Sequence, residues 1–278
     1  MFPLVLALVQ LSTAASASTA PRGFVELSGR PSEADFLCAN YTRNGWVVAS
    51  SGGEVQAELA PSRSFSDPLP FSYEPGENQI GERHVVKVKD GWLVGFDAGE
   101  FGGGLWWFSE NGRRSTQVSP PKDAPVHPDD IYRAENVRGF ARTADRILVL
   151  MGLDHLSARS GRVYNIVRAG NRWKLEPFAV LDGSPDAWLD EGDRVLIVTG
   201  GGLWEARGHS GARQLHALGI GSVYPGSLIK ADDGALYVGM RRYVIRLEET
   251  NGSWTETWFV KADCVYVKVQ YYDCVCSH

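Results

Sequence analysis

The stretch that decides the fold is Asp90-Gly91-Trp92-Leu93-Val94-Gly95, followed by Gly104-Leu105-Trp106-Trp107-Phe108. Asp-Gly favours the positive φ values that a two-residue hairpin turn requires. Short runs of branched and aromatic side chains, bounded by glycines, favour strands over helices. This stretch therefore predicts a strand on each side of the turn and a further strand from Gly104.

The turn recurs along the chain, each time directly before an apolar strand. The other copies are Asn44-Gly45, Asp145-Arg146, Asp193-Arg194 and Asp233-Gly234, and the second residues of successive turns are 46, 55, 48 and 40 positions apart. Repeats of this length, each with several short strands, are typical of the four-stranded blades of a β-propeller.

The same order of elements is predicted inside each repeat. A second strand follows the apolar one, and a polar, alternating strand such as Trp254 to Phe259 closes the unit. Alternation with a period of two indicates a strand with one face in water, as expected at the outer edge of a blade. The inner strands are expected directly before each turn, at Asp35 to Arg43, Arg83 to Lys89, Val137 to Ala144, Asp186 to Glu191 and Ser227 to Ala231.

The predicted fold is an all-β propeller with five full four-stranded blades, in a single domain that spans residues 22–278. Both ends of the chain add strands, at Phe24 to Leu27 and at Val265 to Val269. These strands either form a partial sixth blade shared by the two termini or flank a five-bladed ring.

Three strand ends carry a resemblance to a known group of proteins. They are Val94-Gly95, Val198-Thr199-Gly200 and Val238-Gly239, the first two of which are followed by a Gly-Leu-Trp strand. This pattern resembles bacterial β-propeller repeats of the two-component-regulator and WD-like type, over most of residues 35 to 260. The resemblance implies an architecture but no activity, because propellers carry many unrelated functions.

The composition narrows the class of partner. The chain has 278 residues, of which 44% are hydrophobic, with a net charge of −5 and a pI of about 5.7. That length and apolar content suit one large folded domain. The acidic balance argues against a nucleic-acid partner, which normally requires a basic surface. We expect a monomer.

The first residues predict export from the cytoplasm. An apolar run from Phe2 to Leu11 precedes small residues, and Ala15-Ser16-Ala17 fits a signal-peptidase site. Residues 1–17 are therefore predicted to be a signal peptide, and the mature protein to be secreted or periplasmic with no membrane span. The alternative is a buried N-terminal strand.

The cysteines fit an oxidising compartment. They are Cys38, Cys264, Cys274 and Cys276. A ring closed between Cys274 and Cys276 would be strained, so we expect a bond from Cys38 to one of the C-terminal cysteines. Such a bond would join the two ends of the chain and restrict the unfolded state. Paired Cys-x-x-Cys spacing is absent, so no metal site is assigned.

One face of a propeller collects the longest loops, and function usually lies there. We expect that face to carry Asp97, Glu100, His127, Asp129, Asp130, Asp154, His155, Arg159, Arg241 and Arg242. The set has three interpretations: a carboxylate site for Ca²⁺, a polar substrate site with an acid or base, or solvated loop charges. No cofactor is otherwise expected.

Two functions compete. The first is a binding module that presents its loop-rich face to a protein, peptide or glycan, which the absence of a recognisable catalytic motif favours. The alternative is an enzyme, a hydrolase or lyase acting on a sugar or other polar small molecule at the mouth of the channel. Trp106, Trp107 and Trp204 are interpreted as packing between blades.

Overall fold

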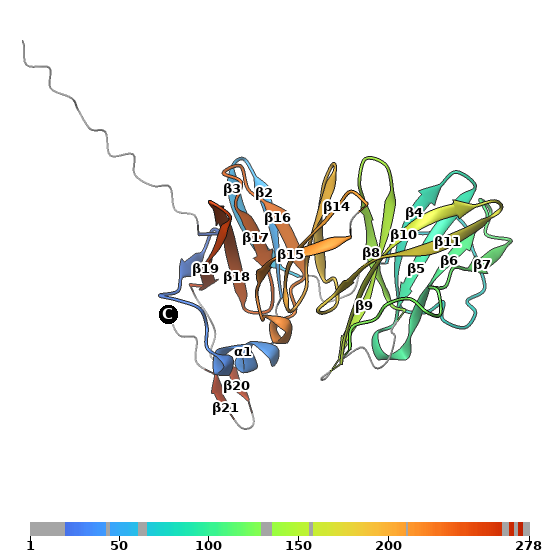
Figure 1. Ribbon diagram of the computed structural model, residues 1–278. Coiled ribbons are helices and arrows are strands. Elements are labelled where there is room, and N and C mark those ends of the chain that lie inside the picture. The colour runs from blue at the N-terminus through green and yellow to red at the C-terminus, as the bar shows by residue number, and fades with distance from the viewer. Residues whose placement is uncertain are drawn as a thin grey trace, which may run out of the picture.

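The structure is a computed structural model that describes residues 20–42, 45–60, 66–128, 135–155, 158–209, 211–262, 267–269 and 272–274. Figure 1 shows antiparallel sheets that follow one another along the chain. Three of them are four-stranded, in the order β4-β5-β6-β7, β11-β10-β9-β8 and β12-β13-β14-β15. The predicted class, an all-β propeller made of four-stranded antiparallel units, is confirmed.

We number the units in chain order. The second unit contains β4 (Glu82–Val88), β5 (Gly91–Asp97), β6 (Gly103–Phe108) and β7 (Ser115–Gln117). The third contains β8 (Val137–Arg142), β9 (Ile147–His155), β10 (Ala158–Ala169) and β11 (Arg172–Leu181). The fourth contains β12 (Ala187–Glu191), β13 (Arg194–Val198), β14 (Gly202–Arg207) and β15 (Ala212–Ala217).

The fifth unit contains one strand more than the second, third and fourth units. It is built from β16 (Ser227–Lys230), β17 (Leu236–Gly239), β18 (Tyr243–Thr250) and β19 (Ser253–Lys261), and β1 (Phe24–Glu26) pairs with the outer edge of β19. The first unit is a hairpin of β2 (Trp46–Ser51) and β3 (Glu54–Leu59), which packs against β16 and β17.

The turns that predicted the units lie where expected. They connect β4 to β5, β8 to β9, β12 to β13 and β16 to β17, and Gly45 leads directly into β2. Asn44 lies outside the described residues. The repeat was therefore visible in the sequence because the same hairpin chemistry opens each unit.

The inner strand predicted from Asp35 to Arg43 is wrong, since helix α1 (Glu33–Asn40) occupies that segment. Ser32 begins the helix with a capping box: its hydroxyl accepts from the Asp35 N–H, and the Asp35 carboxylate accepts from the Ser32 N–H. Phe36 and Ala39, which lie on one face of the helix, pack against the core of the fifth unit. The capping box and two apolar residues at helical spacing therefore favour a helix here, although the position of the segment in the repeat suggests a strand.

The ends of the chain form extra strands rather than a shared sheet. β1 extends the fifth unit, whereas β20 (Val267–Val269) and β21 (Tyr272–Cys274) pair with each other beside α1 (Figure 1). Of the two sequence-based alternatives, the described strands match flanking additions. Among the described residues no helix has the length and apolar character needed to cross a membrane. The predicted signal peptide, residues 1–17, lies outside them.

The second, third and fifth units make close contacts with the following unit at a glycine of their second strand. A Cβ built on Gly95 of β5 would lie 2.1 Å from a Val137 methyl of the next unit, and one on Gly239 of β17 would lie 2.2 Å from the Trp46 carbonyl oxygen. On Gly152 of β9 it would lie 2.9 Å from Pro185. Glycine is therefore required where consecutive sheets approach.

A substitution at Gly95 tests this packing. Gly95→Ala should lower the free energy of unfolding by about 1–3 kcal/mol, because the added methyl overlaps the buried Val137 side chain. Gly226→Ala is the matched control, since a Cβ there meets nothing within 4 Å, and should change stability by about 0.5 kcal/mol or less. Urea unfolding followed by tryptophan fluorescence measures both, and equal midpoints would refute the argument.

The cysteine prediction gives a second test. Cys38 in α1 is disulfide-bonded. Cys264, the side chain of Cys274 and Cys276 lie outside what the structure describes, so the pairing stays a prediction. Proteolysis after thiol blocking, followed by non-reducing mass spectrometry, should recover the Cys38 peptide linked to one that contains Cys264, Cys274 or Cys276. Recovery of Cys38 as a blocked thiol would contradict it.

Candidate functional site

The first predicted site residue, Asp97, is buried at the end of β5, where it accepts several hydrogen bonds. Its carboxylate accepts from the Asn136 amide at 2.8 Å, the Gly99 N–H at 2.8 Å and the Arg138 guanidinium at 2.5 Å. Burial alone would raise the pKa of Asp97, but the Arg138 charge and these donors together lower it. The carboxylate is therefore held as an anion by the next unit.

This contact recurs at equivalent positions of other units. Asp97, Asp154 and Arg241 each stand two residues after the close-contact glycine of their unit, and we call them the clip residues. The Asp154 carboxylate accepts from the Ser184 N–H at 3.0 Å, and Arg241 donates to the Asn40 carbonyl at 2.8 Å. Each contact reaches the segment that opens the next unit, so these side chains fasten neighbouring units together.

Arg138 of β8 joins three units and was not predicted as a site residue. Besides Asp97 of the second unit, it pairs with Asp186, which precedes β12 of the fourth unit, at 3.5 Å. Burial raises the pKa of Asp186 to about 7, a rise that Arg138 opposes and the nearby Asp154 carboxylate reinforces. The sequence offered one signal for Arg138 and Asp186, which is that both lie at the start of a predicted inner strand.

Two titratable groups of β4 face the same cluster. Burial raises the pKa of Glu82, and the Arg138 charge opposes that rise. Burial lowers the pKa of His84, and Arg138 lowers it further, so the imidazole is held neutral at pH 7. The charge of this cluster at neutral pH therefore depends on how many of its carboxyls are ionised.

The structure brings some of the predicted residues together. Glu100, in the β5–β6 connection, and His155, the last residue of β9, form a partly exposed pair in which the Glu100 carboxylate lies 2.9 Å from the His155 Nε2. Arg159 lies opposite Asp154 in the β9–β10 ladder. Burial raises the pKa of Asp154, and the Ser184 N–H and the Arg159 charge oppose the rise.

Other predicted residues have different surroundings. Arg241 stacks on Tyr224, with its guanidinium carbon 4.0 Å from the ring centre. Arg242 is buried, and its guanidinium lies 5.8 Å from the Tyr243 ring centre. His127 lies half-buried in the connection between β7 and β8. Asp129 and Asp130 lie outside the described residues.

The described part of the chain contains no group of three or more histidine, cysteine or acidic side chains arranged to hold a metal ion. Asp97 and Asp154 are already engaged by backbone and side-chain donors. The hypothesis of a Ca²⁺ site therefore gains no support from the loops that suggested it.

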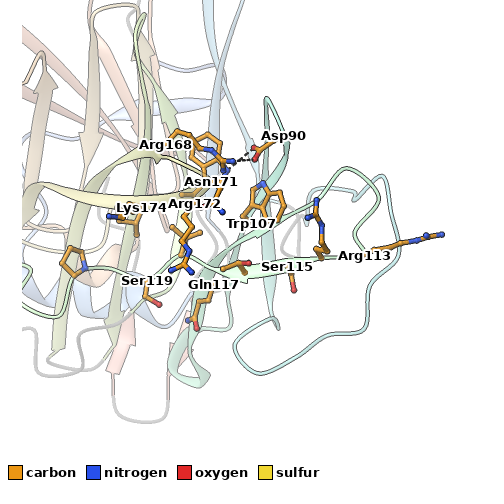
Figure 2. A pocket seen from close by; sticks show the side chains of 16 residues that line it. Asp90, Trp107, Arg113, Ser115, Gln117, Ser119, Arg168, Asn171, Arg172 and Lys174 are labelled. Carbon is orange, nitrogen blue, oxygen red and sulfur yellow. Dashed lines mark hydrogen bonds and ion pairs between the residues drawn. The ribbon is translucent and has the colours of Figure 1, made fainter.

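A cavity lies elsewhere, between the outer strands of the second and third units, and we call it the outer groove (Figure 2). It has a volume of about 1130 Å³. It is lined by Asp90, Trp107, Arg113, Arg114, Ser115, Thr116, Gln117, Val118, Ser119, Pro121, Arg168, Asn171, Arg172, Trp173, Lys174 and Leu175.

The strands that bound the outer groove differ in length. β7 has 3 residues, whereas β10 has 12 and β11 has 10, and the two longer strands carry Arg168, Arg172, Trp173, Lys174 and Leu175 of the lining. Val118 and Leu175 are buried in the core that the two units share, and Trp107 and Trp173 pack against that core. The predicted packing role of Trp107 agrees with this position, but the cavity above it was not predicted.

An ordered carboxylate–guanidinium pair stands in the outer groove. Asp90 pairs with Arg168 at 2.8 Å and accepts from the Trp173 indole N–H at 3.2 Å. The Arg168 guanidinium carbon lies 5.2 Å from the Trp173 ring centre, so the indole face and the carboxylate together fix its position (Figure 2). The Arg114 guanidinium carbon likewise lies over an indole ring, 5.8 Å from the Trp107 ring centre.

The remaining charges of the outer groove are cationic. Among the described residues, Arg113, Arg114, Arg172 and Lys174 form no ion pair. Asp90, paired with Arg168, is the single acidic residue in the lining. A concentrated positive groove in a chain whose net charge is −5 favours an anionic ligand.

No family model matches the chain, and no curated protein matches it. Among solved structures it is similar to the extracellular domain of a putative one-component system from B. thetaiotaomicron, at 13% identity and a TM-score of 0.44, over 76% of this chain and 26% of that one. It is also similar to a catalytically inactive virginiamycin B lyase from Staphylococcus aureus, solved with quinupristin, at 15% identity and a TM-score of 0.40. That match covers 66% of this chain and 57% of the lyase. A streptogramin B lyase matches at 14% identity and a TM-score of 0.38, over 64% of this chain and 61% of that one.

These neighbours are distant. The chain spans about a quarter of the first and less than two thirds of each lyase. The first two have β-propeller folds, the class to which the strand topology assigns this chain. With TM-scores below 0.5 they say nothing about what it binds or catalyses.

The buried Asp186 carboxyl predicts a pH dependence of stability. Its folded pKa of about 7 exceeds the ordinary value of 3.8, so its contribution to stability is complete below about pH 4 and is lost as the pH rises to about 7. Asp186→Asn removes this titration. The stability of the variant relative to the parent, from urea unfolding, should increase between pH 4 and pH 7 and then level off. A constant or falling difference would contradict the burial argument.

Proposed function

We propose that this chain is a secreted or periplasmic binding module whose outer groove holds an anionic ligand. The observation that carries the proposal is the lining of the groove, where four cations without ion pairs and one ordered guanidinium surround an apolar floor. Sites that bind ligands combine such a floor with a few oriented polar groups.

The proposed binding surface is the outer groove and not the loop-rich face. The acidic clip residues there, Asp97 and Asp154, are occupied in joining consecutive units. An enzyme was expected to gather Asp97, Glu100, His127, Asp154 or His155 around a pocket, and none of these lines the outer groove. The groove thus favours the binding module over the hydrolase or lyase alternative.

Two features of the chain support the proposed compartment. Residues 1–17 have the composition of a signal peptide, and Cys38 is disulfide-bonded. Disulfides persist in oxidising compartments such as the periplasm and the extracellular space. A module there meets soluble polymers and cell-surface polymers, many of which are acidic.

Charge reversal in the outer groove tests this function. The parent protein should bind dextran sulfate, with an affinity that falls as the salt concentration rises. Arg172→Glu should weaken binding about tenfold or more, which corresponds to about 1.4 kcal/mol, because Arg172 is exposed on the rim. Isothermal titration calorimetry measures the affinity.

The matched control is Arg22→Glu, an exposed residue beside β1 of the fifth unit with the same change in charge. It should leave the affinity within about twofold of the parent, because long-range charge effects are largely screened at physiological salt. Equal losses in the two variants would mean that the net charge, and not the groove, controls binding.

A further inference from the structure

We infer that the ligand of the outer groove is an acidic polysaccharide whose charges are carboxylates, as in a polymer of uronic acids. This inference rests on the proposed function and names its ligand class. It begins from the carboxylate that the groove already contains, Asp90, which is bound by the Arg168 guanidinium and the Trp173 indole N–H. The protein itself thus shows how a carboxylate is held there.

Ordered cations are suited to this task. Stacking on Trp107 and Trp173 restricts the guanidinium groups of Arg114 and Arg168 before any ligand arrives. Restriction in advance reduces the conformational entropy lost on binding. A guanidinium also matches a carboxylate with two parallel hydrogen bonds, which a lysine ammonium cannot provide.

Uncharged polar side chains along the outer groove indicate a sugar between the charges. Thr116, which lies opposite Trp107 in the β6–β7 ladder, and Asn171, in the β10–β11 turn, offer a hydroxyl and an amide next to the apolar floor. A sugar acid presents the complementary set of groups: hydroxyls for the amides, a C–H face for an apolar surface and a carboxylate for the cations. A chain of such sugars would place charges at intervals along an open groove.

An acidic peptide fits the outer groove less well. A peptide gains affinity by pairing with a free strand edge, and it needs an uninterrupted row of backbone groups. β7 offers 3 residues, and in β11 Pro177 lacks the N–H donor. A nucleic acid is a polyanion too, but it carries phosphates in place of carboxylates, so single-stranded DNA serves as a comparison in the test.

The test compares four polymers on the full chain at 150 mM salt: polygalacturonate, its fully methyl-esterified form, poly-L-glutamate and single-stranded DNA. Polygalacturonate should bind at least tenfold more tightly than each of the other three. Arg172→Glu should weaken that binding about tenfold, and Arg22→Glu should leave it unchanged. Esterification removes the charge but keeps the sugar, whereas poly-L-glutamate keeps the carboxylates on a peptide.

The outcomes separate this inference from the proposed function. Tighter binding of poly-L-glutamate or DNA, with the same loss in Arg172→Glu, would overturn the sugar assignment and leave an anion-binding groove. Equal binding of the esterified polymer would overturn the role of the carboxylates. If dextran sulfate binds through the groove and polygalacturonate does not bind, the inference of a uronic acid polymer is overturned, but the proposed function is not. If no anionic polymer binds through Arg172, both fall.

Discussion

The close approach of consecutive sheets is the constraint on which the rest of this structure depends. A single four-stranded sheet exposes two apolar faces and is not stable alone, so each unit needs its neighbours. The approach requires a glycine where the sheets touch, as at Gly95 against Val137. Two residues later a polar side chain crosses the same boundary, as Asp97 does toward Asn136. Apolar packing and a directed hydrogen bond therefore set the spacing and the register of neighbouring units.

This arrangement places Asp97, Asp154 and Arg241, which look functional in the sequence, in contacts between consecutive units. The end of a second strand is both the place where loops gather and the place where the next unit begins. Asp97 and Arg138 illustrate the result, since Asp97 is buried, Arg138 is half-buried and the two charges are paired between units. Leaving one partner of such a pair without the other is costly, which constrains both positions together.

Sequence patterns predicted the fold well because hairpin turns and alternating apolar residues are local signals. The turn at Asp90-Gly91 and the strand from Trp92 lie where expected. The segment 33–40 was misjudged because its position in the repeat suggested a strand, whereas its cap and two apolar side chains specify a helix. The outer groove could not be predicted, since its lining comes from strands of two units that are far apart in sequence. Arg168 and Asp90 lie far apart in sequence, and only the packed sheets bring them together.

The short strand β7 has a consequence for how such a protein diversifies. The close-contact glycines and the clip residues lie on second strands or directly after them, while the outer groove is bounded by β7, β10 and β11. Insertions or deletions at this periphery can therefore reshape the ligand cavity while the central scaffold stays intact. For the same reason, a graft that lengthens β7 can close the cavity, and one that shortens the β10–β11 hairpin can widen it.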